Sequence, residues 1–274
     1  MNMLPLPQNL FAQQVLSNYS SWWQNYESEF SVKIPLGQSQ HYMLQRKYAD
    51  DSRLKFKKGD CPRKAIPCIE ISPLYREAKD GILFVNCNPS GTDYEYYRDH
   101  NTNHEDCFYY GEQKPNNSYF NAAEAFATAV GINNDNFAMI DVFPIVIQNQ
   151  AVLKEAYKKA EGSQRNAFNQ LLDFFLYNIF QIQPRVIVAT NAFVKDLFTS
   201  DDKKAHPFSL RNLSLLDDFE DKGDLVYYRI VVKGIETNLF CGGMIAGGHQ
   251  MDTESKSRLI RDVKCFLKHS TIQF

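Results

Sequence analysis

The sequence predicts an α/β fold, a three-layer sandwich in which helices cover both faces of a central, mostly parallel sheet. Short apolar runs, such as residues 82–85 and the four residues after Arg185 in the expected strand 185–189, alternate with longer segments of helical periodicity. Apolar strands separated by helices of ten or more residues are typical of parallel sheets buried on both faces. The chain has 274 residues, of which 44% are hydrophobic and 23% charged. This balance is that of a globular protein with a full core.

The expected elements alternate along most of the chain. In order, they are helix 9–30, strand 82–85, helix 119–130, strand 137–140, helix 164–180, strand 185–189, helix 191–198, strands 225–232 and 238–241, and helix 252–268. Two polar insertions, 93–117 and 199–223, interrupt the pattern, and the second contains the acidic run 217–221.

We expect a single α/β domain over residues 1–274, because neither insertion has the composition of an interdomain linker. Within it, residues 1–70 form an N-terminal helical and basic extension packed on a core that spans residues 81–268. Segment 42–67 of the extension carries eight Lys or Arg against three Asp. It is either a phosphate-contacting surface or a solvated loop.

Charge and cysteine content limit the possible partners and compartment. The formal net charge is −2, so a polyanion would have to be met by a local basic patch. We expect the six cysteines to be reduced thiols, because a chain of this size does not need disulfides. The sequence starts without a signal-peptide pattern, and no apolar run approaches the ~18 residues of a membrane span. These features predict a cytoplasmic protein without a membrane, metal or cofactor partner.

Polar or small residues follow four of the expected strands at the point where each ends. In an open parallel sheet the ligand crevice lies beyond the carboxyl ends of the strands, so these residues are candidate site residues. They are NCNPSG at 86–91, DVFP at 141–144, TN at 190–191 and GGMIAGGH at 242–249.

The order of these motifs resembles the uracil-DNA glycosylase superfamily. In its mismatch-specific and single-strand-selective branches, the first motif reads Gly-x-Asn-Pro-Gly and an aromatic pair at a helix start follows. NCNPS at 86–90 is similar to the first motif, PNNSYF at 115–120 to the second, and PRVIVATNA at 184–192 to the third strand and its turn. The likeness runs from about residue 81 to residue 267. The family's last motif, His-Pro-Ser or Asn-Pro-Ser, is replaced here by GGHQM at 247–251.

The resemblance implies a hydrolase that flips a uracil or another damaged base out of DNA and cleaves its N-glycosidic bond without a cofactor. Asn88 would position the hydrolytic water, and Asp93 is an alternative base. His249 would stabilise the departing base anion. The ligand would be DNA or another nucleotide-containing molecule.

The resemblance also implies residues that bind the base and the DNA. Asn191 would read a pyrimidine edge with its carboxamide, while Tyr119, Phe120 and Ser90 would complete the base-binding site. Met251 is the candidate apolar wedge that fills the gap left by a flipped base. The candidate DNA contacts, besides Met251, are Gly248, Lys256 and Arg258.

Each candidate also has an ordinary structural explanation. Asn-Pro-Ser-Gly is a good turn sequence, Asn191 stands where a helix N-cap is favoured, and aromatic residues at a helix start often belong to the core. The alternative function is a non-catalytic module that binds a nucleotide or nucleic acid on the same fold. A thiol hydrolase using Cys87 or Cys241 with His249 is the weakest hypothesis, because the sequence places no acid to orient the histidine.

Overall fold

The protein is described by a computed structural model. It covers residues 21–22, 25, 68–69, 81–87, 108–109, 118–132, 136–143, 150–223, 227–245 and 250–269. The basic segment 42–67 and most of the expected helix 9–30 therefore lie outside the described residues. Trp22 is an exception: it is buried, and its indole Nε1 donates a hydrogen bond of 3.0 Å to the carbonyl of Ala167.

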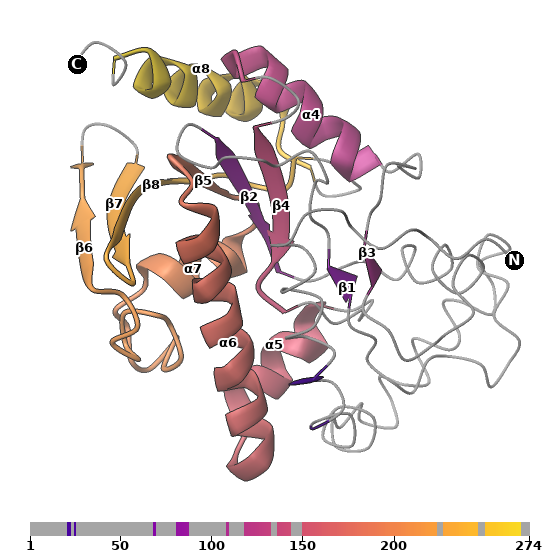
Figure 1. Cartoon of the computed structure of the whole chain (residues 1–274), viewed down its shortest axis with the longest axis vertical. Coiled ribbons are helices and arrows are strands. Elements are labelled where there is room, and N and C mark those ends of the chain that lie inside the picture. The colour runs from indigo at the N-terminus through magenta and orange to yellow at the C-terminus, as the bar shows by residue number, and fades with distance from the viewer. Residues whose placement is uncertain are drawn as a thin grey trace, which may run out of the picture.

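A six-stranded sheet forms the centre of the molecule (Figure 1). Its strands lie in the order β4 (Phe137–Asp141), β2 (Ile82–Asn86), β5 (Val186–Ala189), β8 (Ile235–Cys241), β7 (Tyr227–Val232) and β6 (Asp218–Asp221). The pairs from β4 to β8 are parallel, and β7 and β6 continue the sheet in antiparallel pairs. Two short strands, β1 (Cys68–Ile69) and β3 (Phe108–Tyr109), pair separately.

Helices cover both faces of this sheet, as Figure 1 shows. One face carries α4 (Ser118–Val130) and α8 (Thr253–His269), and the other carries α5 (Gln150–Lys159), α6 (Gly162–Ile182) and α7 (Ala192–Thr199). Within the described chain, no helix has the length and apolar character that a membrane crossing requires.

The side chains of each buried strand alternate between the two faces of the sheet. Phe84 of β2 and its counterparts Met139 and Val188 pack with α4 and α8. The next residues, among them Val85 and Ile140, pack with α5, α6 and α7. Successive side chains of a strand point to opposite faces, so a strand buried on both sides is apolar at every position. This explains the uninterrupted apolar runs in the sequence.

The predicted α/β class and the mostly parallel sheet are confirmed, with differences in the elements. The short strands β1 and β3 were not predicted. Helix α5 was not predicted, and the acidic run in the second polar insertion forms strand β6. Two β6 carboxylates are matched by Arg229 on the neighbouring strand β7, whose guanidinium contacts Asp218 and lies 2.9 Å from Glu220. The same guanidinium also contacts Glu236 of β8 at 3.0 Å. Neutralisation by one central arginine lets this acidic segment pair at the sheet edge.

Arg165 closes the end of α5. Its Nε donates to the carbonyl of Ala160 at 3.0 Å and its Nη2 to that of Tyr157 at 2.5 Å, two acceptors at the end of a helix that have no partner within it. The guanidinium also stacks on the ring of Phe208, 3.4 Å from its centroid. The planar fork thus joins α5, the start of α6 and the loop after α7.

We expect Arg165→Lys to lower the free energy of unfolding by about 1–3 kcal/mol, because an ammonium group keeps the charge but cannot form this fork and stack together. Urea unfolding measures the change. Arg258→Lys on the exposed face of α8 is the matched control and should change stability by less than about 0.5 kcal/mol. Equal losses in the two variants would contradict the role assigned to Arg165.

Candidate functional site

The strand order places a topological switch point between β2 and β5. The chain passes from β2 to β4 on one side and later returns to β5 on the other side of β2. In open α/β sheets, the crevice beyond the carboxyl ends at such a point is the usual place for a ligand. The candidate site is therefore the carboxyl edge of β4, β2 and β5.

Three polar residues form a row across this edge: Asp141, Asn86 and Thr190, here called the polar row. Asn86 and Asp141 are register partners, and Thr190 directly follows Ala189, the partner of Val85. The residue before each of them packs against α5, α6 and α7. Because successive side chains of a strand point to opposite faces, the three polar side chains lie on the face that carries α4 and α8. They are nearly inaccessible, with exposed fractions of 5%, 8% and 0%.

A short hydrogen bond orients the amide of Asn86. The Thr190 hydroxyl donates to Asn86 Oδ1 at 2.5 Å and also lies 3.0 Å from the carbonyl oxygen of Val85. A separation of 2.5 Å fits an O–H···O bond and is shorter than an N–H···O bond. The amide oxygen of Asn86 therefore faces Thr190, and its NH₂ group is the end that remains for other acceptors.

Asn191 is the N-cap of α7. Its Oδ1 accepts a hydrogen bond of 2.9 Å from the backbone N–H of Val194, and the side chain is 9% exposed. The structural explanation of this residue is confirmed. This hydrogen bond also identifies the oxygen end of the Asn191 carboxamide, and it occupies one of the two lone pairs of Oδ1. Base reading by Asn191 stays a prediction.

The two thiols at the carboxyl edge are poor nucleophiles. Burial raises the pKa of Cys87 to about 12, with a smaller lowering by Lys154 and a smaller rise from Asp141. Burial likewise raises the pKa of Cys241 to about 12. At neutral pH only about one thiol in 10⁵ is then a thiolate, the reactive form. These values argue against the thiol-hydrolase hypothesis.

The N-terminus of α8 is already occupied by a side chain of the protein. Asp252 accepts hydrogen bonds of 2.8 Å from both the backbone N–H and the hydroxyl of Ser255. These bonds hold the pKa of Asp252 below its usual range. The capping carboxylate occupies a backbone N–H donor that a phosphate would need, and its negative charge repels a phosphate. This helix end is therefore a poor phosphate site.

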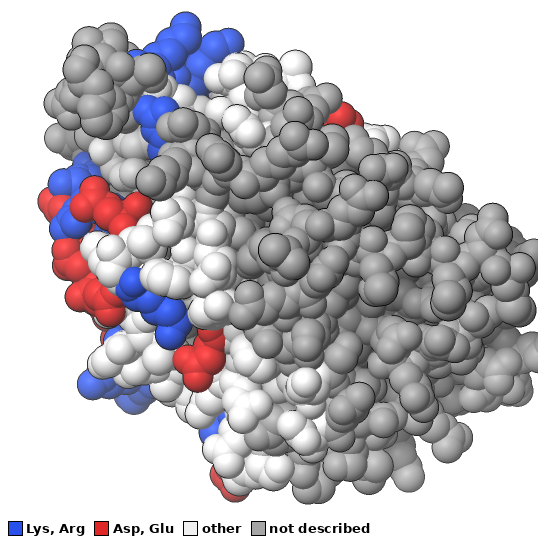
Figure 2. Space-filling view, viewed as in Figure 1, with Lys and Arg blue, Asp and Glu red and all other residues white. Residues whose placement is uncertain are grey.

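Basic side chains of α8 gather at the top of the molecule, while acidic ones gather over β6 and β7 (Figure 2). Two of the α8 lysines bond backbone carbonyls: Lys264 Nζ reaches Ala129 at 2.9 Å and Lys256 Nζ reaches Ile245 at 3.5 Å. Arg258 pairs with Glu254 at 3.2 Å. Of the two predicted DNA contacts on α8, Arg258 is the more exposed, and its surface ion pair is weak enough to exchange for a phosphate.

Met251 packs inward, over the glycines that follow β8. A Cβ atom at Gly243 would lie 2.7 Å from Met251 Cγ, and one at Gly242 would lie 2.7 Å from Leu259 Cδ2. Met251 also contacts the core shared by β8 and α8. The glycines are thus explained by close packing, and these contacts favour a structural role for Met251 over that of a DNA wedge.

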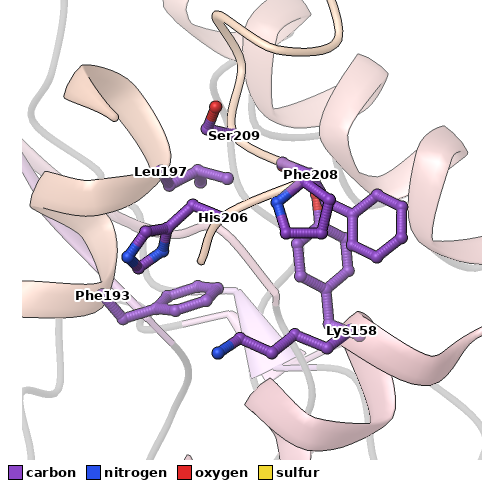
Figure 3. Close-up of a pocket in the computed structure, with 8 residues that line it drawn as sticks. Lys158, Phe193, Leu197, His206, Phe208 and Ser209 are labelled. Atoms are coloured by element: carbon purple, nitrogen blue, oxygen red, sulfur yellow. Dashed lines mark hydrogen bonds between the residues drawn. The ribbon is translucent and has the colours of Figure 1, made fainter. Parts of the chain in front are cut away.

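A separate pocket opens between α5, α7 and the loop that follows α7 (Figure 3). Its walls include Lys158, Phe193, His206 and Phe208. The cavity volume is about 20 Å³, enough for one water molecule. It is far too small for a nucleobase, because ligand pockets usually enclose hundreds of Å³.

Several predicted site residues cannot be placed. Asn88, Ser90, Asp93, Gly248 and His249 lie outside the described residues, and Tyr119 and Phe120 are known only as part of the first turn of α4. The loop that holds Gly248 and His249 is closed at its base, where the Met251 N–H donates to the Met244 carbonyl at 2.7 Å. Among the residues that can be placed, none form a cluster of metal-ligating side chains.

The sequence analysis did not predict that the three residues of the polar row lie side by side. Its three residues stand in the motifs after the strands, but their contact depends on the register between strands that are far apart in the chain. The only available signal was that each apolar run ends in a hydrogen-bonding side chain.

No protein-family model matches the chain, and no curated protein matches it either.

Gly243→Ala should lower the free energy of unfolding by about 1–3 kcal/mol, because the new methyl group would overlap Met251. The same substitution in a Met251→Ala background should cost less, with a coupling of about 0.5–3 kcal/mol in a double-mutant cycle. Chemical denaturation of the four proteins measures both quantities. Additive losses would show that Met251 does not pack on Gly243.

Asp252→Ala should destabilise the protein at pH 7, and the difference from the parent should shrink at acidic pH. The folded-state pKa of Asp252 is lowered, so its contribution is present above the ordinary carboxyl pKa of about 3.9 and is lost as the pH falls through the folded-state value. Melting temperatures at pH 7 and pH 3 test this. Asp252→Asn keeps a capping oxygen and is the control; a gap independent of pH would refute the prediction.

Proposed function

We propose that the protein is a nucleobase-excising hydrolase of the uracil-DNA glycosylase type, which binds DNA and cleaves the N-glycosidic bond of a flipped uracil or other damaged base. One observation carries the proposal. The switch point between β2 and β5 brings together the ends of the strands that lead into Asn88 and Asn191. These are the two motifs on which the resemblance to that superfamily mainly depends.

The proposed reaction needs few groups from the protein. The C1′–N bond breaks and leaves its electron pair on the base, water adds its oxygen to the sugar cation at C1′, and the proton released by the water neutralises the base. An amide such as Asn88 orients the water, and a hydrogen-bond donor such as His249 stabilises the leaving base. The high pKa values of Cys87 and Cys241 fit a mechanism without a covalent thiol intermediate.

The alternative proposal is a binding module without catalysis. It is favoured by two expected site residues that have structural roles, since Asn191 caps a helix and Met251 fills a core contact. Asp252, which was not an expected site residue, also closes the N-terminus of α8 where a phosphate could have bound. Incubation with oligonucleotides containing uracil, hypoxanthine or a mismatch, followed by alkali, separates the two proposals. Strand scission at the modified position supports the hydrolase, and binding without scission supports the module.

Asn88→Ala should lower single-turnover cleavage by roughly 10²–10⁴-fold, the range for a positioned catalytic group, and should leave DNA affinity nearly unchanged. Gel quantification of abasic sites measures the rate, and fluorescence anisotropy measures the affinity. Asp173→Asn, on the exposed side of α6, is the control for activity that is lost during the preparation of a variant protein. Equal cleavage by Asn88→Ala and the parent would remove Asn88 from the mechanism.

A further inference from the structure

Two lysines of α5 stand close to the candidate site with ammonium groups that no carboxylate of the described residues neutralises. We infer that Lys154 and Lys158 bind backbone phosphates of the DNA strand that carries the flipped base. The inference rests on the proposed function, since it takes DNA as the ligand. It adds a contact surface on α5, a helix that the sequence motifs did not indicate.

Lys154 lies near the carboxyl edge of the sheet. Its Nζ is 5.2 Å from the centroid of the Phe193 ring, and Phe193 is the second residue of α7, the helix that follows β5. Burial is the main influence on the pKa of Cys87, which it raises, and the charge of Lys154 lowers the same pKa. Cys87 directly follows β2. A DNA strand bound at the switch point between β2 and β5 therefore passes close to the Lys154 ammonium group.

The Lys154 ammonium is held in place but not neutralised. Its side chain is half-buried, and the Phe193 ring attracts the cation without taking up its N–H donors. Of the three lysines of α5, Lys159 has a carboxylate partner, Glu155, at 2.8 Å. Neither Lys154 nor Lys158 forms an ion pair with any of the residues described here. An anion from outside the protein would stabilise a charge that is partly removed from water in this way.

Lys158 extends this surface by one helical turn. Residues four apart on a helix are neighbours on one face, with Cβ atoms about 5–6 Å apart. Lys158 is exposed, and it lines the small pocket between α5 and α7 together with Phe193 and His206 (Figure 3). The acid on this side, Asp196, lies 3.8 Å from His206. Because the pocket is too small for a base, this surface contacts the DNA backbone.

Backbone phosphates suit two ammonium groups of this kind. An ammonium is a compact point charge on a flexible stem, so it needs no exact geometry from its anion. Phosphate contacts position a strand and carry no sequence information directly. Since the formal net charge of the chain is −2, local cations have to hold DNA. Helix α5 packs on one face of the sheet and α8, with its own basic side chains, on the other. Cations therefore flank the sheet on both faces.

The salt dependence of DNA binding tests the inference. Fluorescence anisotropy with a single-stranded oligonucleotide that contains one uracil gives the affinity of the full chain at several salt concentrations. Each phosphate contact on a single strand adds about 0.7 to the log–log slope. Between about 50 and 200 mM salt, Lys154→Gln and Lys158→Gln should each lose about threefold less affinity than the parent, and the double variant about sevenfold less.

Lys233→Gln is the matched control. It removes the same charge from the exposed turn between β7 and β8, at the opposite edge of the sheet, and should keep the parent's slope. Melting temperatures show that the variants are folded, and Lys158→Gln, on the exposed face of α5, tests the surface even where Lys154→Gln loses stability.

A parent slope in both folded lysine variants, or equal changes in these and in Lys233→Gln, overturns the inference. Failure of the parent to bind the oligonucleotide, with or without binding of a polyglutamate peptide, overturns it as well. Alkali treatment of the same oligonucleotide separates this result from the proposed reaction. Reduced slopes without scission by the parent refute the hydrolase and support the phosphate contacts, whereas scission with unchanged slopes refutes only the contacts.

Discussion

The parallel register of β2 with β4 and β5 is the constraint on which the site depends. It brings the last residues of three strands, distant in sequence, to one edge, and backbone bonds continue it past the strand ends. The Val142 N–H donates to the Asn86 carbonyl at 3.0 Å, and that of Thr190 donates to the Val85 carbonyl at 3.0 Å. A slip of one residue would turn the polar row into the α5–α7 core, so hydrophobic burial and polar satisfaction select the same pairing.

The groups around this edge are positioned mainly by packing. Gly242 and Gly243 let α8 and Met251 approach the end of β8, and the Met251 N–H donates a hydrogen bond to the Met244 carbonyl. In the same way, the N-cap bond of Asn191 fixes the start of α7. A side chain with such a structural role can still contact a ligand. Because its orientation is already fixed, it loses less conformational entropy when the ligand binds.

The sequence predicted the buried strands well because their signal is local. Residues 82–85 and 137–140 are apolar at every position, and β2 and β4 extend each run by one polar residue, Asn86 and Asp141. Strand β6 was missed because its acidic side chains contradict strand propensity. The pairing is favoured mainly by Arg229, eight or more residues away, which contacts two of the β6 carboxylates. The site was harder to predict for the same reason: the amide of Asn86 is oriented by Thr190, a contact across 104 positions.

Burial decides which chemistry this edge can support. Removing a thiol from water favours its neutral form, so Cys87, which follows β2, and Cys241, which ends β8, are mostly unreactive thiols at neutral pH. Burial also disfavours the charged form of a carboxyl group such as that of Asp141. A hydrogen bond between neutral groups, such as the one from the Thr190 hydroxyl to Asn86, is strengthened where water is excluded. The polar row formed by Asp141, Asn86 and Thr190 therefore depends on hydrogen bonds for its stability at this edge. The energetic cost of a polar group without a partner is greatest where the side chain is least exposed, and these three side chains are almost completely buried.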